Sequence, residues 1–164
     1  MKTSQIDTRG ADSGERGASS QYLTFELGPE TYAVPLLQVQ EIRQYTPATR
    51  IPNAPSYVIG VINLRGAIIA VVDLRPRLGL PALNDEEQSI VVVANVGEKT
   101  YGLRADSVSD VTEIAHSLLQ PPPVVATDAQ QRFLSALAQV HDRVLILLDL
   151  SKIVDVEAID RLAA

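Results

Sequence analysis

The chain has 164 residues, of which 46% are hydrophobic, and it carries a formal net charge of −6. This length predicts one domain, or two small lobes, with enough apolar residues to form a core. The acidic balance argues against binding to nucleic acid or to anionic lipid, because both require a basic face. The absence of cysteine excludes disulfide bonds, thiolate metal sites and a catalytic cysteine.

The first 20 residues are rich in serine, glycine and charge, and we expect residues 1–20 to form a disordered tail. They lack the apolar core of a signal peptide. No apolar stretch in the chain reaches the roughly 18 residues that a membrane-spanning helix needs. We therefore expect a cytoplasmic protein without direct membrane insertion, folded over residues 21–164.

Two short strands and a helix are predicted after the tail. The strands, Tyr22–Leu27 and Thr31–Pro35, are separated by a Gly-Pro pair, which is typical of a turn. In Leu36–Ile42 an apolar residue recurs at every third position, which predicts a short helix with one buried face. Glu41 lies on the polar face of that predicted helix.

A β-hairpin is predicted next. The apolar runs 58–64 and 67–72 flank the sequence Asn-Leu-Arg-Gly, and the glycine can supply the positive φ of a tight turn. The arginine of this turn is Arg65, which cannot easily be buried at a hairpin tip. Its guanidinium group suits a docking contact with carboxylates or backbone carbonyl groups.

Three polar residues are candidate helix or turn caps. Asn53 is a plausible N-cap for a short helix over Ala54–Val58. Asp73 and Asp149 each end an apolar strand, where a short acceptor can cap the following turn. A pair of carboxylates could instead serve acid–base catalysis, but capping is the better interpretation.

The sequence contains an internal repeat. Residues 27–34 align with 96–103 at an offset of 69, with Gly, Thr and Tyr at identical places. Residues 68–74 align with 144–150 at an offset of 76, and an Asp-Leu pair ends both segments. We interpret the two matched blocks together as a duplication.

The two repeats span roughly 22–80 and 90–156. The repeat predicts a second short helix over Ser107–Ile114, and the change of offset predicts an insertion near 119–128. The spacing of apolar residues over 155–162 predicts a terminal helix packed on the body.

Short strands with glycine and proline between them predict a mainly β fold made of small barrels rather than a parallel sheet. A unit of about 65 residues usually cannot bury a full core alone. We therefore expect the two repeats to pack around a shared apolar core in a pseudo-twofold arrangement.

The sequence has no phosphate-binding loop, no dinucleotide fingerprint and no Gly-x-Ser-x-Gly elbow. Its two histidines, His116 and His141, lack the spacing of metal ligands. We therefore predict no metal, no cofactor and no enzymatic activity. Catalysis by carboxylates is the alternative that the many acidic residues leave open.

These segments resemble the CheW-type chemotaxis adaptors. The resemblance runs from about residue 22 to residue 156 and depends on the order and spacing of six segments: 32–36, 39–43, 51–55, 60–66, 72–75 and 106–111. The Asn-Leu-Arg-Gly turn, followed by an apolar strand and Asp-Leu-Arg, is quite specific.

The resemblance implies a mainly β fold of two SH3-like five-stranded barrels, with short helices and a C-terminal helix. It implies a non-enzymatic adaptor that links the cytoplasmic tips of methyl-accepting chemoreceptors to the regulatory domain of a histidine kinase. Such an adaptor acts at receptor arrays in two-component signal transduction. Self-association into rings is a further expectation.

Carried over position by position, the resemblance assigns receptor contact to four side chains: Val39, Glu41, Arg65 and Val108. It assigns turn or groove structure to three residues: Gly60, Asn63 and Gly66. Two residues stand where relatives have glycine, namely Ala136 and His141, so the contacts of the second repeat are less defined.

Other functions remain open at this level. The chain could be an adaptor of the same family for another receptor–kinase pathway, such as twitching motility or surface sensing. It could also be a ligand-binding regulatory domain with a small-molecule pocket between its two lobes.

Overall fold

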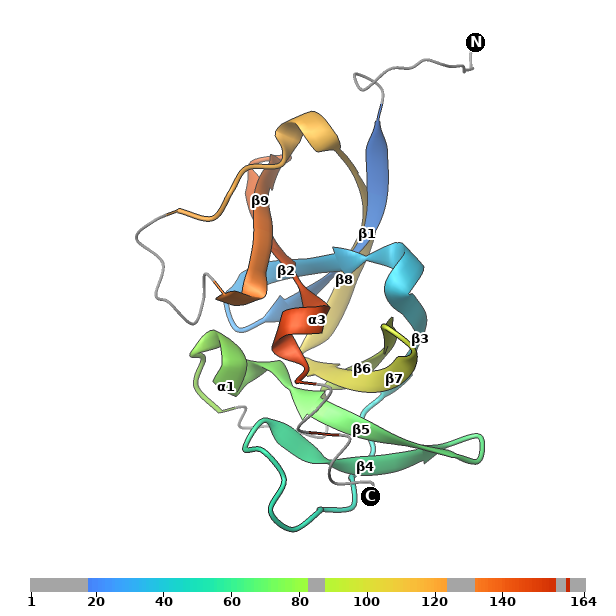
Figure 1. The fold of residues 1–164 in the computed structure, drawn as a ribbon. Helices are drawn as coiled ribbons and strands as arrows, with labels where there is room; N and C mark the ends of the chain where they lie inside the picture. Colours follow the sequence, from blue (N-terminus) through green and yellow to red (C-terminus); the bar gives the residue numbers. More distant parts are fainter. Residues whose placement is uncertain (1–17, 83–87, 124–131, 156–158, 160–164) are drawn as a thin grey trace.

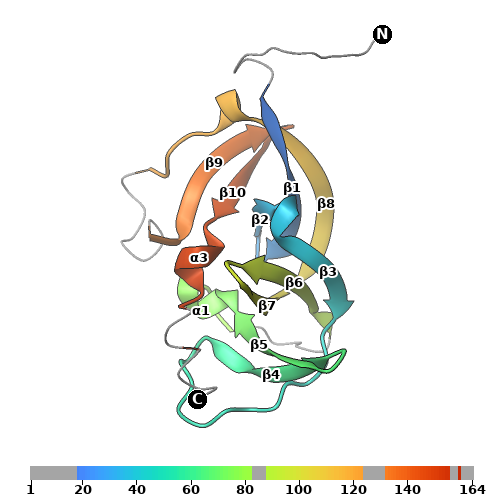
Figure 2. The same cartoon turned by 45° about the vertical axis from the view of Figure 1, so that its right-hand side comes forward.

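The computed structural model describes residues 18–82, 88–123, 132–155 and 159. Within these ranges the chain forms two five-stranded sheets (Figures 1 and 2). Sheet A has the order β8 (Ser107–Ala115), β1 (Ser19–Leu27), β2 (Glu30–Pro35), β10 (Arg143–Leu148) and β9 (Leu134–Val140). Sheet B has the order β3 (Val39–Gln44), β6 (Ile90–Val96), β7 (Lys99–Ala105), β5 (Ala67–Asp73) and β4 (Val58–Leu64). Short helical segments connect the strands, among them η4 (Leu36–Gln38), α1 (Leu74–Leu78), η6 (His116–Leu118) and α3 (Leu150–Ile153).

Each sheet contains strands from both repeats. The first two strands of one repeat join the last three strands of the other, so β1 and β2 lie in sheet A while β6 and β7 lie in sheet B. The two parallel pairs, β2 with β10 and β7 with β5, are equivalent at the offsets of 69 and 76. The structure thus has the predicted pseudo-twofold arrangement, but with strands exchanged between the repeats.

The core is divided into three clusters. The largest lies between the sheets and takes residues such as Phe25 and Leu103 from each of them. A second cluster belongs to sheet A alone and includes Leu145, and a third belongs to sheet B alone and includes Ile69. Successive side chains of a strand point to opposite faces, so each sheet can cover both a barrel interior and the shared core. The prediction of two small barrels around a shared core is confirmed.

One β-bridge joins the two edges of each sheet. Thr49, which follows β3, pairs with Val61 of β4, and Gln120, which follows β8, pairs with Leu137 of β9. Gly60 lies where the first of these crossings is made. A Cβ atom at Gly60 would lie 2.3 Å from the carbonyl oxygen of Thr49, so this crossing requires a glycine.

Both predicted short helices of the repeats are wrong. Leu36–Gln38 forms one 3₁₀ turn, the following residues form β3, and Ser107–Ile114 lies within β8. The reason is a β-bulge in each strand, which inserts one extra residue. Val39 and Ile42 are three residues apart, but their partners on β6, Ala94 and Val92, are only two residues apart. The bulge therefore gives the apolar residues of this strand the three-residue spacing that is typical of a helix.

The hairpin prediction is confirmed, whereas the helix predicted just before it is wrong. β4 and β5 are antiparallel and meet at a turn formed by Arg65 and Gly66. Residues 52–57 form turns rather than a helix, and Asn53 adopts a left-handed φ of 64° instead of the extended conformation of an N-cap.

The two aspartates at the strand ends are confirmed as caps. The Asp73 side chain accepts a hydrogen bond of 3.1 Å from the Arg75 amide, and it is the N-cap of α1. The Asp149 side chain accepts one of 3.1 Å from the Ser151 amide at the start of α3.

Several predicted segments lie largely outside the described residues, including most of the tail, the insertion near 119–128 and the terminal helix over 155–162. Strand β1 begins at Ser19, inside the segment predicted to be a tail, because Ser19 and Ser20 pair with the end of β8. Ile159 is helical and buried. Across the ranges described above, no helix is long and apolar enough to cross a membrane.

Candidate partner-binding surface

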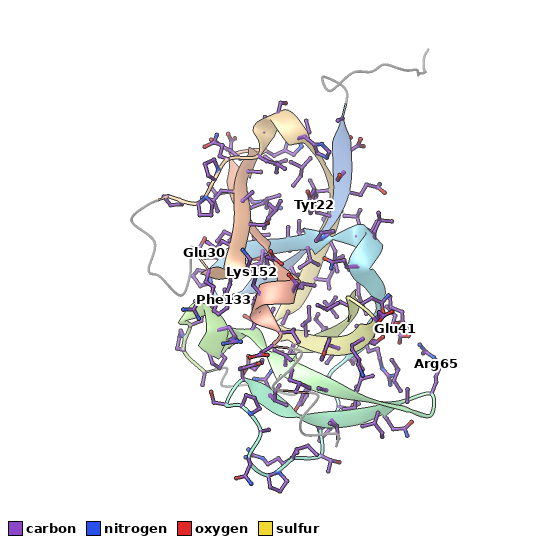
Figure 3. The ribbon with its side chains drawn as sticks, in the orientation of Figure 1. Tyr22, Glu30, Glu41, Arg65, Phe133 and Lys152 are labelled. Atoms are coloured by element: carbon purple, nitrogen blue, oxygen red, sulfur yellow. The ribbon has the colours of Figure 1, made fainter. Side chains whose placement is uncertain are left out.

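Two of the predicted contact residues meet directly. The guanidinium group of Arg65, at the β4–β5 turn, donates a hydrogen bond to the carboxylate of Glu41 on β3 and forms an ion pair with it. Figure 3 shows the two side chains together at one edge of the molecule. The Arg65 side chain is 62% exposed and that of Glu41 is 27% exposed, so a partner can reach the pair from solvent.

The ion pair shifts the ionisation of both groups. The hydrogen bond from Arg65 is the largest influence on Glu41 and lowers the pKa of its carboxyl group, and the positive charges of Arg65 and Arg43 act in the same direction. The same hydrogen bond raises the pKa of Arg65. Both groups are therefore charged at neutral pH, and the edge presents a fixed pair of opposite charges.

The turn chemistry holds Arg65 at the hairpin tip. Arg65 and Gly66 both have positive φ, 50° and 90°, as a tight two-residue hairpin turn requires. The Asn63 side chain accepts a hydrogen bond of 3.0 Å from the Gly66 amide and closes the turn. His141 and Asp142 adopt the same positive φ in the second repeat, so the two hairpin tips are equivalent.

The two predicted apolar contacts lie in different sheets. Val39 begins β3 in sheet B and pairs with Ala94, while Val108 lies near the start of β8 in sheet A and pairs with Phe25. Both valines are half-buried and pack against the shared core. Val39 thus lies on the same strand as Glu41, and Val108 belongs to the opposite side of the shared core.

Exposed apolar residues near this surface were missed by the sequence analysis. Leu37, on η4 just before β3, is 98% exposed. Ile42 was placed on a buried face, but it is exposed on β3, as is its repeat equivalent Val111 on β8. They were missed because the predicted helix placed Ile42 on a buried face, whereas β3 and β8 are edge strands of their sheets and leave these side chains partly exposed. A search for bulged strands at equivalent positions of the repeats could have found them.

The two strand-end aspartates have structural partners besides the backbone. Asp73 forms an ion pair of 3.0 Å with the buried Arg104, and Asp149 lies 4.0 Å from Lys152. A carboxylate held by a cap and a cation is poorly suited to proton transfer. Within the described ranges, no group of three or more histidine and acidic side chains is arranged to hold a metal ion.

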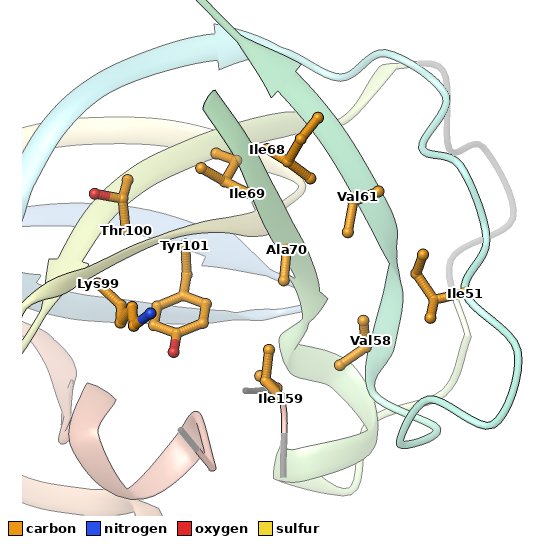
Figure 4. Close-up of a pocket in the computed structure, with 10 residues that line it drawn as sticks. All are labelled: Ile51, Val58, Val61, Ile68, Ile69, Ala70, Lys99, Thr100, Tyr101 and Ile159. Atoms are coloured by element: carbon orange, nitrogen blue, oxygen red, sulfur yellow. The ribbon is translucent and has the colours of Figure 1, made fainter. Parts of the chain in front are cut away.

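An apolar pocket lies against sheet B (Figure 4). Its volume is about 240 Å³, and its lining comes from β4, β5, β7, the loop before β4 and Ile159. Typical small-molecule sites occupy about 300–1,000 Å³ and contain several convergent polar groups. The pocket is smaller than this range, so it gives little support to a small-molecule site.

A comparison with known families decides the class of protein. The model of the CheW-like domain matches residues 21–158. The chain belongs to the CheW-like family. This CheW-like chain is 37% identical over 137 residues to the chemotaxis protein CheW of Klebsiella aerogenes, covering 84% of this chain and 82% of that relative. It is 35% identical over 130 residues to a probable chemotaxis protein CheW of Rhizobium etli, covering 79% and 84% of the two chains.

A solved structure agrees with the family. The scaffolding protein TtCheW from Thermoanaerobacter tengcongensis has a TM-score of 0.78 with this CheW-like chain at 29% identity, over 86% of this chain and 96% of that one. The chain is therefore a chemotaxis coupling protein, a scaffold without catalytic activity. The family resemblance and the two-barrel fold inferred from the sequence are both confirmed.

Proposed function

We propose that the edge of sheet B formed by β3 and the β4–β5 turn binds the cytoplasmic tip of a chemoreceptor. The ion pair between Glu41 and Arg65 carries this proposal, because it presents two fixed and exposed charges beside apolar side chains. Val39 contributes apolar contact area from β3, and Val108 contributes it from across the shared core. The charges set the orientation of the receptor and reject wrong partners more than they add affinity.

The barrel of sheet A then binds the regulatory domain of the histidine kinase. A scaffold must hold two partners at separate places, and the pseudo-twofold arrangement provides a second barrel of the same plan. The same geometry suits weak self-association into rings. In this proposal the protein works in the cytoplasm at membrane-associated receptor arrays, and kinase output follows the relative movement of receptor tip and kinase.

Co-sedimentation with receptor-containing membranes, with and without the partner kinase, tests the proposal. We expect the protein to pellet with receptors and to bring the kinase down with it. Binding to a kinase without binding to any receptor of the same cell would assign the protein to another input, such as twitching motility or surface sensing. Binding to neither partner would contradict the proposal.

A further inference from the structure

Arg77 occupies an unusual place on α1. Its guanidinium carbon lies 3.9 Å from the centre of the Tyr57 ring and 4.9 Å from the centre of the Phe133 ring. Its Nε donates a hydrogen bond of 2.9 Å to the carbonyl oxygen of Ile153. Both rings are buried, so the contacts to the cation are largely shielded from water.

The residues around Arg77 are related by the internal repeat. Tyr57 and Phe133 are equivalent at the offset of 76, and their carbonyl oxygens accept equivalent hydrogen bonds from Asp73 and Asp149. Arg77 is itself equivalent to Ile153, whose carbonyl group it contacts. The pseudo-twofold relation therefore brings two aromatic rings to one place, and Arg77 of the first repeat contacts both of them.

The contacts of Arg77 connect the two sheets. Tyr57 immediately precedes β4 of sheet B, while Phe133 immediately precedes β9 of sheet A. Ile153 ends α3, which follows β10 of sheet A. We infer that Arg77 is a positioning residue that fixes the hairpins β4–β5 and β9–β10, and hence the two barrels, relative to one another.

This inference deepens the proposed function and rests on it, because it concerns how the receptor-binding edge is connected to the barrel that binds the kinase. Tyr57 lies at the base of β4, and Arg65 lies at the other end of the same hairpin, roughly 26 Å away at about 3.3 Å per residue. A force on the receptor-binding edge therefore reaches the base of the hairpin through a paired strand. At the base of the hairpin, the contacts of Arg77 transmit this force to the barrel that binds the kinase.

The position of the barrels can be measured in this chain alone. The chain has no cysteine, so Gln44→Cys on β3 and Gln139→Cys on β9 provide two unique and exposed sites for spin labels. We expect pulsed electron–electron double resonance to give a narrow distribution of distances between the two spin labels in the chain that keeps Arg77. Arg77→Met should broaden or shift it, because the side chain keeps its apolar length but loses the cation and the Nε donor.

Arg132 offers a matched control. Its guanidinium carbon lies 5.8 Å from the centre of the Phe133 ring, but its side chain is exposed. Arg132→Met should leave the distance distribution unchanged. A distribution for Arg77→Met as narrow and as centred as that of the parent would overturn the inference. Should Arg77→Met fail to fold, Arg77→Lys, which keeps the charge without the flat stacking surface, is measured in its place.

A second measurement separates positioning from simple stability. Arg77→Met should bind receptor membranes and the kinase separately with unchanged affinity, while receptor-dependent control of kinase activity falls roughly fivefold or more, as expected for the loss of a coupling contact. Full control by this variant would contradict a positioning role. Failure of the parent chain to bind receptors would instead contradict the proposed function, and would leave the distance measurement as the deciding test of the inference.

Discussion

Glu41 and Arg65, 24 positions apart in the chain, form a hydrogen-bonded ion pair that joins β3 to the β4–β5 turn. These segments belong to opposite edges of sheet B, so the pair spans the same gap in the barrel that the bridge of Thr49 and Val61 closes. Exposed ion pairs contribute little to stability. The value of this pair is therefore the fixed orientation of two charges at a surface that a partner can reach.

Arg65→Glu should abolish receptor coupling without unfolding the protein. The change places two like charges at the tip and removes the hydrogen bond to Glu41, while exposed substitutions of this kind usually alter stability by about 0.5 kcal/mol or less. Co-sedimentation with receptor membranes measures the coupling, and thermal unfolding checks the fold. His141→Glu, at the equivalent turn of the second repeat, is the control and should still co-sediment. Unfolding of the Arg65 variant would reject this role for Arg65.

The ionisation of Glu41 should depend on Arg65. The pKa of Glu41 is lowered in the folded protein. The stabilisation that the ion pair contributes is therefore fully present above the unfolded pKa of about 4.3, and it is lost as pH falls through the lower pKa of the folded state. We therefore expect the pair to stay intact between pH 5 and 8. A carbon-detected NMR titration of the Glu41 carboxyl group should show its pKa rise in Arg65→Ala. Equal pKa values in both proteins would contradict the ion pair between Glu41 and Arg65.

Gly60→Ala should destabilise the fold. The added Cβ would lie 2.3 Å from the Thr49 carbonyl oxygen, and backbone rather than a flexible side chain would have to move. Overpacking of this kind costs about 1–3 kcal/mol, which chemical denaturation can measure as a lower midpoint. Ala136→Gly, at the equivalent place in the second repeat, should change stability by less than about 1 kcal/mol. A neutral Gly60→Ala would show that the crossing adjusts without strain.

Asp106→Ala should also reduce stability. Asp106 forms an ion pair with the buried Arg75 and accepts a hydrogen bond of 2.8 Å from the Gly28 amide. Its loss leaves a buried cation without its carboxylate, and such losses cost about 3 kcal/mol. We expect a smaller effect, about 2 kcal/mol, since Asp106 is partly exposed. Asp110→Ala, on the exposed part of β8, serves as control and should change the free energy of unfolding by about 0.5 kcal/mol or less.

Much of the fold could be read from local signals. Glycine at a turn with positive φ, apolar runs on each side of it and an aspartate at the strand end are short-range patterns, and they gave the β4–β5 hairpin and both caps correctly. The repeat added the pseudo-twofold arrangement. The ion pair at the hairpin tip needed more, because Glu41 was placed on a helix that does not exist.

The remaining features depend on long-range pairing. A bulge at Gln40, and another at Ser109, can be recognised only once the partner strand is known. The exchange of strands between repeats depends on the two parallel pairs, and nothing in the sequence near β2 indicates that its neighbour is β10. The cation between Tyr57 and Phe133 was missed for the same reason.

The exchange of strands has a consequence for how the protein folds. β1 and β2 are synthesised well before β8, β9 and β10, which complete their sheet. Sheet A cannot close until β10 has been synthesised, and pairings between such distant segments are slow to form. A chain cut between the repeats would give two halves that each lack part of both sheets. Neither half would contain a complete sheet, so we expect neither half to fold alone.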